Sequence, residues 1–211
     1  MKIIFLDVDG VLNGYNIRLH IVVQLIRLFK QPVAKYINIF SVHIMKVFIL
    51  FLIVKLSGSK VVLSSSWRGG YWQIPVEEMS DNTKKLYNLF KFFHIDIIGI
   101  TPYNPKDRGA QIKAYINNCN YKIESFVIID DEMFDIKDYY PKDRLLCTIG
   151  DPNRLIKYKY CGIYDGAGLK FKHIILALKI LKRNIKVRVV YHHSHFYIYL
   201  PFLPSLIPNS T

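Results

Sequence analysis

The chain has 211 residues and is 51% hydrophobic, which suits one domain, or one domain with an appendage, around a substantial core. Its formal net charge of +13 is unevenly spread, because residues 10–76 hold eight basic and no acidic side chains. A cationic surround favours a polyanion such as nucleic acid, or an anionic membrane surface, and the alternative is a lysine-rich composition that serves solubility. Three widely spaced cysteines without a CxxC pair argue against a zinc site or a disulfide framework, and for a cytoplasmic location.

The chain opens with an apolar run that ends in two aspartates. Lys2 to Leu6 is typical of a strand buried on both faces, and Asp7, Asp9 and Gly10 follow it. Two carboxylates this close resist joint ionisation unless a cation lies between them. Mg²⁺ prefers carboxylate and phosphate oxygens, and ligands of open α/β sheets bind at the carboxyl ends of the strands. This opening therefore indicates a metal and phosphate site, and the alternative is an acidic turn.

Helical patterns alternate with short apolar strands along the rest of the chain. Further strands are expected at 60–63, 95–100, 125–129 and 144–148, and helices at 17–29, 42–56, 83–93, 109–117 and 169–181. Gly69 and Gly70 are typical of a flexible turn. The alternation predicts an α/β three-layer sandwich with a central, mostly parallel sheet.

The last residues fit this pattern poorly. Lys186 to Leu200 alternates weakly, and three prolines follow it. The segment could form an extra strand pair, an oligomer contact or a loosely ordered tail. We therefore expect a domain over 1–184 and a C-terminal extension of uncertain structure over 185–211.

Residues 37–56 raise the alternative of a membrane-associated protein. A spanning helix needs about 20 predominantly apolar residues. Asn38, His43, Lys46 and Lys55 interrupt this window. We expect a buried helix here and no stable membrane insertion.

Three further strand ends carry groups that phosphoryl transfer requires. Ser64 offers a small hydroxyl and free backbone donors, and Arg108 or Lys106 offers a cation against the charge of the transferring group. No Gly-rich phosphate loop is present, so a carboxylate nucleophile is the natural acceptor of a phosphoryl group. More carboxylates for a metal follow the fourth strand, at Asp130, Asp131 and Asp135.

This order of motifs resembles the haloacid dehalogenase-like (HAD) phosphohydrolase superfamily. The similarity is carried by DVDGVLN at 7–13, VVLSSSWR at 61–68, DRGAQI at 107–112 and VIIDDEMFD at 127–135. With Gly168 and Leu169 before the last helix, these motifs resemble one branch, the HAD domain of Swiss Army Knife RNA-repair proteins. The resemblance covers about residues 1–181.

The resemblance implies catalytic roles for four residues. Asp7 would be the nucleophile that becomes a phospho-aspartate, and Asp9 the general acid for the leaving oxygen and then the base for water. Ser64 would bind the phosphoryl oxygens, and Arg108 would stand where the family has a lysine or arginine. Further candidates for substrate binding are Ser65, Arg68 and Lys106.

The resemblance also implies a Mg²⁺ site. Asp7 and the backbone carbonyl of Asp9 would hold the ion together with Asp131. Asp130 and Asp135 would support this acidic set.

The connections between the motifs leave room for a small cap at most over the site. An open site suits a bulky phosphomonoester such as an RNA or DNA end, and the positive charge agrees with this. Trp67, Tyr71 and Trp72 either stack on a base or belong to the core. We predict a Mg²⁺-dependent phosphomonoesterase, with a non-catalytic HAD-fold module that binds nucleic acid or a partner as the alternative.

Overall fold

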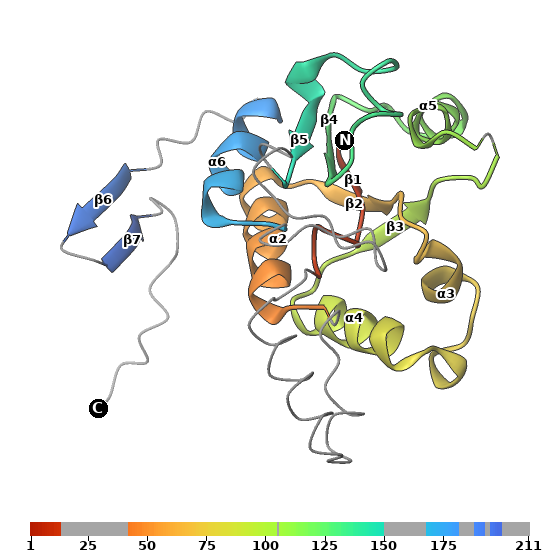
Figure 1. Cartoon of the computed structure of the whole chain (residues 1–211), viewed down its shortest axis with the longest axis horizontal. Helices are drawn as coiled ribbons and strands as arrows, with labels where there is room; N and C mark the ends of the chain where they lie inside the picture. Colours follow the sequence, from red (N-terminus) through yellow and green to blue (C-terminus); the bar gives the residue numbers. More distant parts are fainter. Residues whose placement is uncertain (14–41, 105, 150–167, 182–187, 193–194, 200–211) are drawn as a thin grey trace, which may run out of the picture.

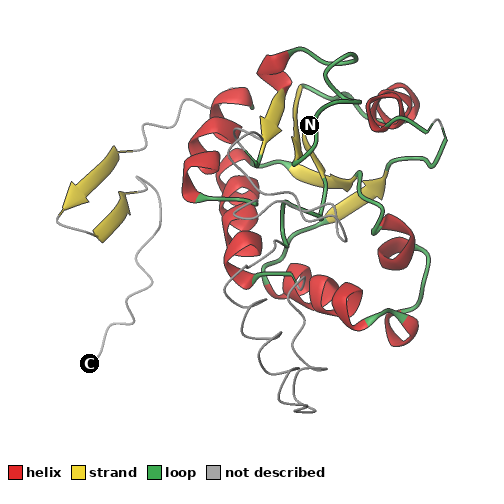
Figure 2. Ribbon diagram, viewed as in Figure 1, coloured by secondary structure: helices red, strands yellow, loops and turns green. Residues whose placement is uncertain are grey.

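Five parallel strands form the central sheet of the protein (Figures 1 and 2). Strand β1 (Lys2–Leu6) lies between β2 (Lys60–Leu63) and β4 (Ser125–Asp130), and β3 (Ile97–Ile100) and β5 (Leu145–Cys147) form the edges. The computed structural model describes residues 1–13, 42–104, 106–149, 168–181, 188–192 and 195–199. The predicted α/β architecture with a parallel sheet is confirmed.

Both faces of the sheet are covered by helices because the strands are apolar on both sides. Ile4 and Leu6 of β1 point into one core, and Ile3 and Phe5 point into the other. Three helices cover the first face, namely α2 (Ile44–Ser57), α4 (Asp81–Phe92) and α6 (Phe171–Ile180). Helix α5 (Arg108–Asn118) covers the second face, so the domain has three layers (Figure 1).

The strand order creates a switch point beside β1. The chain proceeds from β1 outward to β2 and β3, then returns to the other side of β1 for β4 and β5. Ligands of such sheets bind at the carboxyl ends of the strands where the order reverses. The loops after β1 and β4 meet there, and these loops carry the predicted acidic residues.

Local capping explains where element boundaries differ from the predicted ones. Helix α4 begins at Asp81, because the Ser80 hydroxyl accepts a hydrogen bond from the Thr83 N–H. His94 has a positive φ of 51°, and this turn delays the start of β3 to Ile97. The flexible turn expected at Gly69 and Gly70 is wrong, since both lie in the short helix α3 (Arg68–Trp72). Two single helical turns complete the described elements, η2 (Val76–Glu78) and η3 (Lys142–Arg144).

Several sequence predictions fall wholly or partly outside the described residues. The helix expected at 17–29 lies there, as do the start of the apolar window at 37–41 and residues 14–41 of one of the two connections expected to leave room for a small cap at most. The remainder of that window is α2, whose Val47, Leu50 and Ile53 are buried. Within the described ranges, no helix has both the length and the apolar character that a membrane span requires.

A separate antiparallel pair follows the domain. Strand β6 (Arg188–His192) pairs with β7 (His195–Tyr199), with Val190 opposite Tyr197. A strand pair, one of the alternatives for residues 185–211, is therefore present in the described residues 188–192 and 195–199.

Candidate active site

The polar residues that follow the strands are brought into one row by the sheet itself. Each donates its backbone N–H to the neighbouring strand at an N···O distance of 2.9–3.0 Å, so the ladder continues one residue beyond the strand. The donors are Asp7, Ser64, Thr101 and Thr148. This register places the first residue after β1, β2, β3 and β5 along a single edge.

Three buried carboxylates meet at this edge. Asp7, Asp130 and Asp131 are 2%, 0% and 8% exposed, and one oxygen of each lies within 4.8 Å of the others. Asp7 comes from the end of β1, and the other two come from the end of β4. Gly10 permits this approach, because its φ is +67° and a Cβ at this position would overlap the Asp131 carboxylate.

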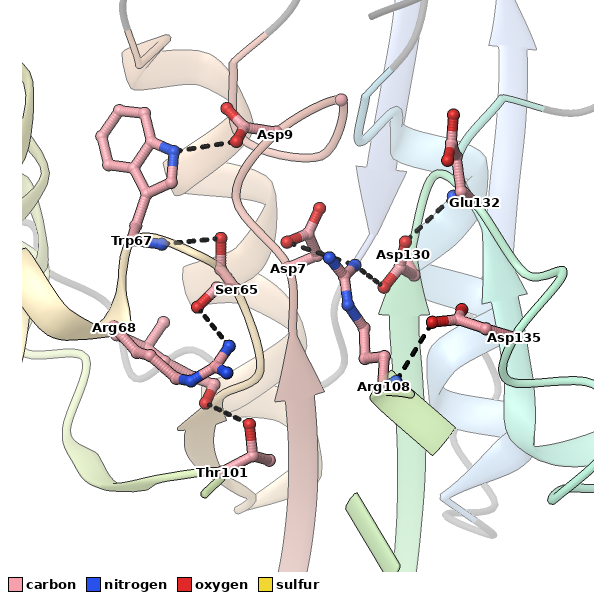
Figure 3. Close-up of polar contacts among 12 residues, drawn as sticks. Asp7, Asp9, Ser65, Trp67, Arg68, Thr101, Arg108, Asp130, Glu132 and Asp135 are labelled. Atoms are coloured by element: carbon pink, nitrogen blue, oxygen red, sulfur yellow. Dashed lines mark hydrogen bonds and ion pairs between the residues drawn. The ribbon is translucent and has the colours of Figure 1, made fainter. Parts of the chain in front are cut away.

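Arg108 is the cation that contacts this cluster. Its guanidinium pairs with the Asp130 carboxylate and lies 3.4 Å from Asp7 Oδ1 (Figure 3). Burial lowers the pKa of Arg108, but the charges of Asp7 and Asp130 outweigh this effect and raise the pKa above its usual value. Since Arg108 is the first residue of α5, the start of that helix fixes the cation beside the nucleophile predicted at position 7.

The cluster carries more negative charge than Arg108 can balance. Burial, followed by the charge of Asp130, raises the pKa of Asp7 well above its usual value. The same two causes raise the pKa of Asp131 to about 7. A divalent cation among these oxygens would favour the ionised forms, and a set of carboxylate oxygens is the kind of site that Mg²⁺ prefers. The residues present therefore fit the predicted ion.

These raised pKa values predict how pH and Mg²⁺ affect stability. A carboxyl whose pKa is raised on folding stabilises the native state below its unfolded pKa, near 4, and this contribution is lost as pH rises through its folded pKa. The metal-free protein should therefore become less stable between pH 5.5 and pH 8. Mg²⁺ at 100 times its dissociation constant should restore about 2.7 kcal/mol at pH 8, which raises the unfolding midpoint by roughly 5–10 °C.

Thermal unfolding at pH 5.5 and pH 8, with Mg²⁺ and with a chelator, measures this effect. Asp131→Asn should flatten the pH dependence and remove most of the Mg²⁺ effect, because the amide carries no charge. Asp138→Asn, which changes an exposed aspartate, is the matched control. An equal Mg²⁺ effect in both variants would contradict a metal site at Asp131.

Asp9 lies beside the cluster rather than in it. Its carboxylate accepts a hydrogen bond from Asn13 Nδ2 at 2.7 Å. It accepts a second one from the Trp67 indole Nε1 at 3.0 Å (Figure 3). The Asn13 side chain also accepts a hydrogen bond from the Gly10 N–H at 2.8 Å, which ties the loop together. Sequence reasoning did not identify Asn13 as a site residue and placed Trp67 in a stacking or core role.

Ser64 presents a free hydroxyl at the same edge. Its Oγ is buried and has no hydrogen-bond partner among the described residues. The hydroxyl of Ser65, by contrast, accepts from the Trp67 N–H at 3.4 Å. A buried hydroxyl without a partner is costly, so Ser64 is the serine that a bound phosphate oxygen would satisfy.

The remaining predicted residues lie around this centre. Asp135 accepts a hydrogen bond from the Arg108 backbone N–H at 3.1 Å, so it caps α5 and is not in the carboxylate cluster. Lys106 is exposed, and Arg108 is the residue of this pair that contacts the carboxylates. Thr148 was missed because the strand expected at 144–148 included it, whereas β5 ends at Cys147. Its hydroxyl donates to the Gly10 carbonyl at 2.8 Å.

A parallel sheet with its acidic cluster at the switch point beside β1 places the chain in the class of HAD-like Rossmannoid domains. The particular family follows from the sequence comparison. Residues 3–151 match the family model for the HAD domain in Swiss Army Knife RNA repair proteins, and the chain belongs to that family. The resemblance seen in the motifs is thereby confirmed. No curated protein and no solved structure is significantly similar to the chain.

Proposed function

We propose that the protein is a Mg²⁺-dependent phosphomonoesterase that works through a phospho-aspartate on Asp7. Membership of the HAD family supports phosphohydrolase chemistry. The observation that carries the proposal is the cluster of Asp7, Asp130 and Asp131 with Arg108 at the carboxyl edge of the sheet. A binding module has no need for three buried carboxylates at this point, because their burial and mutual repulsion are costly.

Each residue has a role in the proposed reaction. A carboxylate oxygen of Asp7 attacks phosphorus, the bond between phosphorus and the ester oxygen breaks, and Asp9 gives a proton to the leaving oxygen. Water then attacks the phospho-aspartate, Asp9 takes a proton from that water, and inorganic phosphate leaves with Asp7 regenerated. Asn13 and Trp67 hold the Asp9 carboxylate through its two oxygens, so its orientation is set before substrate binds.

The developing charge is stabilised by groups that are already in place. Ser64 would donate its hydroxyl to a phosphoryl oxygen, and Arg108 would offset negative charge on the transferring group. Asp7, Asp131 and the backbone carbonyl of Asp9 would hold Mg²⁺, which when bound neutralises charge between nucleophile and phosphate.

We further propose phosphorylated ends of RNA or DNA as the substrates, with the protein in the cytoplasm. The family description concerns RNA repair, and a net charge of +13 would favour a polyanion. Trp72 at the end of α3 and Tyr103 in the loop after β3, each 48% exposed, offer aromatic surface near this edge of the sheet.

Hydrolysis of p-nitrophenyl phosphate tests the proposed chemistry without assuming a substrate. We expect turnover that requires Mg²⁺ and is lost with a chelator. Oligonucleotides with 3′- or 5′-terminal phosphate, compared with nucleoside monophosphates, then test the substrate class. A folded protein that binds RNA without metal and hydrolyses none of these compounds would be a binding module instead.

A further inference from the structure

Arg68 is a buried cation that forms no ion pair in the described part of the chain. Its residue is 6% exposed, and none of the ion pairs among the described residues involves it. The Nη1 group donates to the Ser65 carbonyl at 2.8 Å, while Nε is buried and has no hydrogen-bond partner in the described part of the chain. A buried charge is normally paired, since leaving water without compensation is expensive. Among the described residues, this guanidinium therefore has no anion paired with it.

The surroundings of Arg68 hold its guanidinium in a fixed orientation. The Tyr103 ring lies over it, with 4.3 Å between Cζ and the ring centroid. Tyr103 belongs to the loop after β3, and Ser65 to the loop after β2, so two strand ends hold the side chain. Burial lowers the pKa of Arg68 and the charge of Arg108 adds to this, while Tyr103 and Asp7 oppose it. The charges around Arg68 therefore leave its positive charge able to attract a further anion.

The carboxylate cluster forms no ion pair with Arg68 among the described residues, although the charge of Asp7 acts on it. Asp7 and Asp130 are engaged by Arg108, which comes from the opposite face of the sheet. Figure 3 shows Arg68 and Arg108 approaching the site from different elements, α3 and α5. In the proposed reaction, Ser64 and Arg108 would serve the phosphoryl group that is transferred. Arg68 remains available for a second anionic group of the same substrate.

We infer that Arg68, held by Tyr103 and Ser65, is a subsite for the phosphodiester next to the terminal phosphate of a nucleic-acid end. The inference rests on the proposed function and deepens it, because it states how the enzyme would distinguish a strand end from an isolated phosphomonoester. Guanidinium groups suit such phosphodiester oxygens because their N–H donors are arranged in a rigid fork.

Pairs of dinucleotides with a 3′- or 5′-terminal phosphate test this subsite. In each pair, the internal linkage of one compound is a natural phosphodiester and that of the other is a neutral methylphosphonate. For the wild type, the neutral linkage should lower kcat/KM about 10- to 100-fold, the effect of one hydrogen bond to a charged group. Arg68→Met should remove this preference, and its kcat/KM should fall much further for the natural dinucleotide than for p-nitrophenyl phosphate. Arg68→Lys should retain part of the preference.

A control variant and the comparison of substrates separate the possible results. Lys113→Met removes an exposed positive charge from α5 and should leave the preference intact. A purely structural role of Arg68 would lower activity on all substrates equally, and equal linkage preference in wild type and Arg68→Met would overturn the inference. If no substrate is hydrolysed, the proposed function fails. In that case, the affinities of the wild type and of Arg68→Met for the two dinucleotides still test the subsite. If the two linkages are bound equally well by the wild type, the subsite is refuted.

Discussion

Replacing Asp7 with asparagine is expected to lower kcat by at least about 10³-fold while the protein stays folded. The amide keeps the shape of the side chain but is a poor nucleophile, so no phospho-aspartate can form. Burial and the charge of Asp130 already raise the pKa of Asp7, and a neutral side chain relieves that repulsion. We therefore expect the unfolding free energy at pH 8 to be unchanged or higher by about 1 kcal/mol.

Steady-state hydrolysis of p-nitrophenyl phosphate and thermal unfolding of the same samples measure both effects. Asp138→Asn serves as the matched control, because it makes the same chemical change at an exposed position and should leave activity unaltered. An Asp7→Asn variant that retains more than a tenth of wild-type turnover would show that Asp7 is not the nucleophile.

Replacing Arg108 with methionine is expected to reduce both stability and activity. The change leaves the buried carboxylates of Asp7 and Asp130 without the cation that they share. Removing one partner of a buried ion pair is strongly destabilising, and with 27% of the Arg108 side chain exposed we expect roughly 2–4 kcal/mol at pH 8. The loss should be smaller at pH 5.5, where the carboxyls take up protons. Turnover should fall about 10²-fold or more, as it does when one charge-stabilising donor is lost.

Arg108→Lys separates charge from geometry. Lysine keeps the positive charge, so it should recover much of the stability, but its single ammonium cannot contact both carboxylates in the way that a guanidinium does. Chemical denaturation at the two pH values, together with kcat, gives the comparison. If Arg108→Met is as stable and as active as the wild type, Arg108 is not the balancing cation of the site.

The strand ends were the part of the site that could be predicted from the sequence. A buried parallel strand must be apolar, so a polar residue directly after it lies at the carboxyl edge, where Asp7 and Ser64 are found. The structure gives β1 and β2 the predicted bounds, and β4 ends one residue later than expected, at Asp130. Parallel pairing of the strands then brings these residues together, so their proximity follows from the predicted sheet alone.

The positions of the neighbouring acids could not be predicted from the residues, although the resemblance singled out Asp131 as a metal ligand. Asp131 joins the cluster, whereas Asp135 caps α5, and the difference depends on the backbone path of a loop. The contact between Trp67 and Asp9 likewise joins loops from two strands, and no local spacing reveals it. The contact of Arg68 with Tyr103 spans 35 positions, so the sequence named Arg68 as a candidate for substrate binding but did not reveal this contact.

Chemical trapping of the phospho-aspartate tests the central proposal most directly. Borohydride reduces an acyl phosphate on aspartate to an alcohol, so protein quenched during turnover of a phosphomonoester with Mg²⁺ should contain homoserine at position 7. Peptide mass spectrometry identifies the modified residue, and omission of substrate or Mg²⁺ should abolish it. Homoserine at a different aspartate, or steady turnover with Asp7 never modified, would contradict a phospho-aspartate mechanism at Asp7.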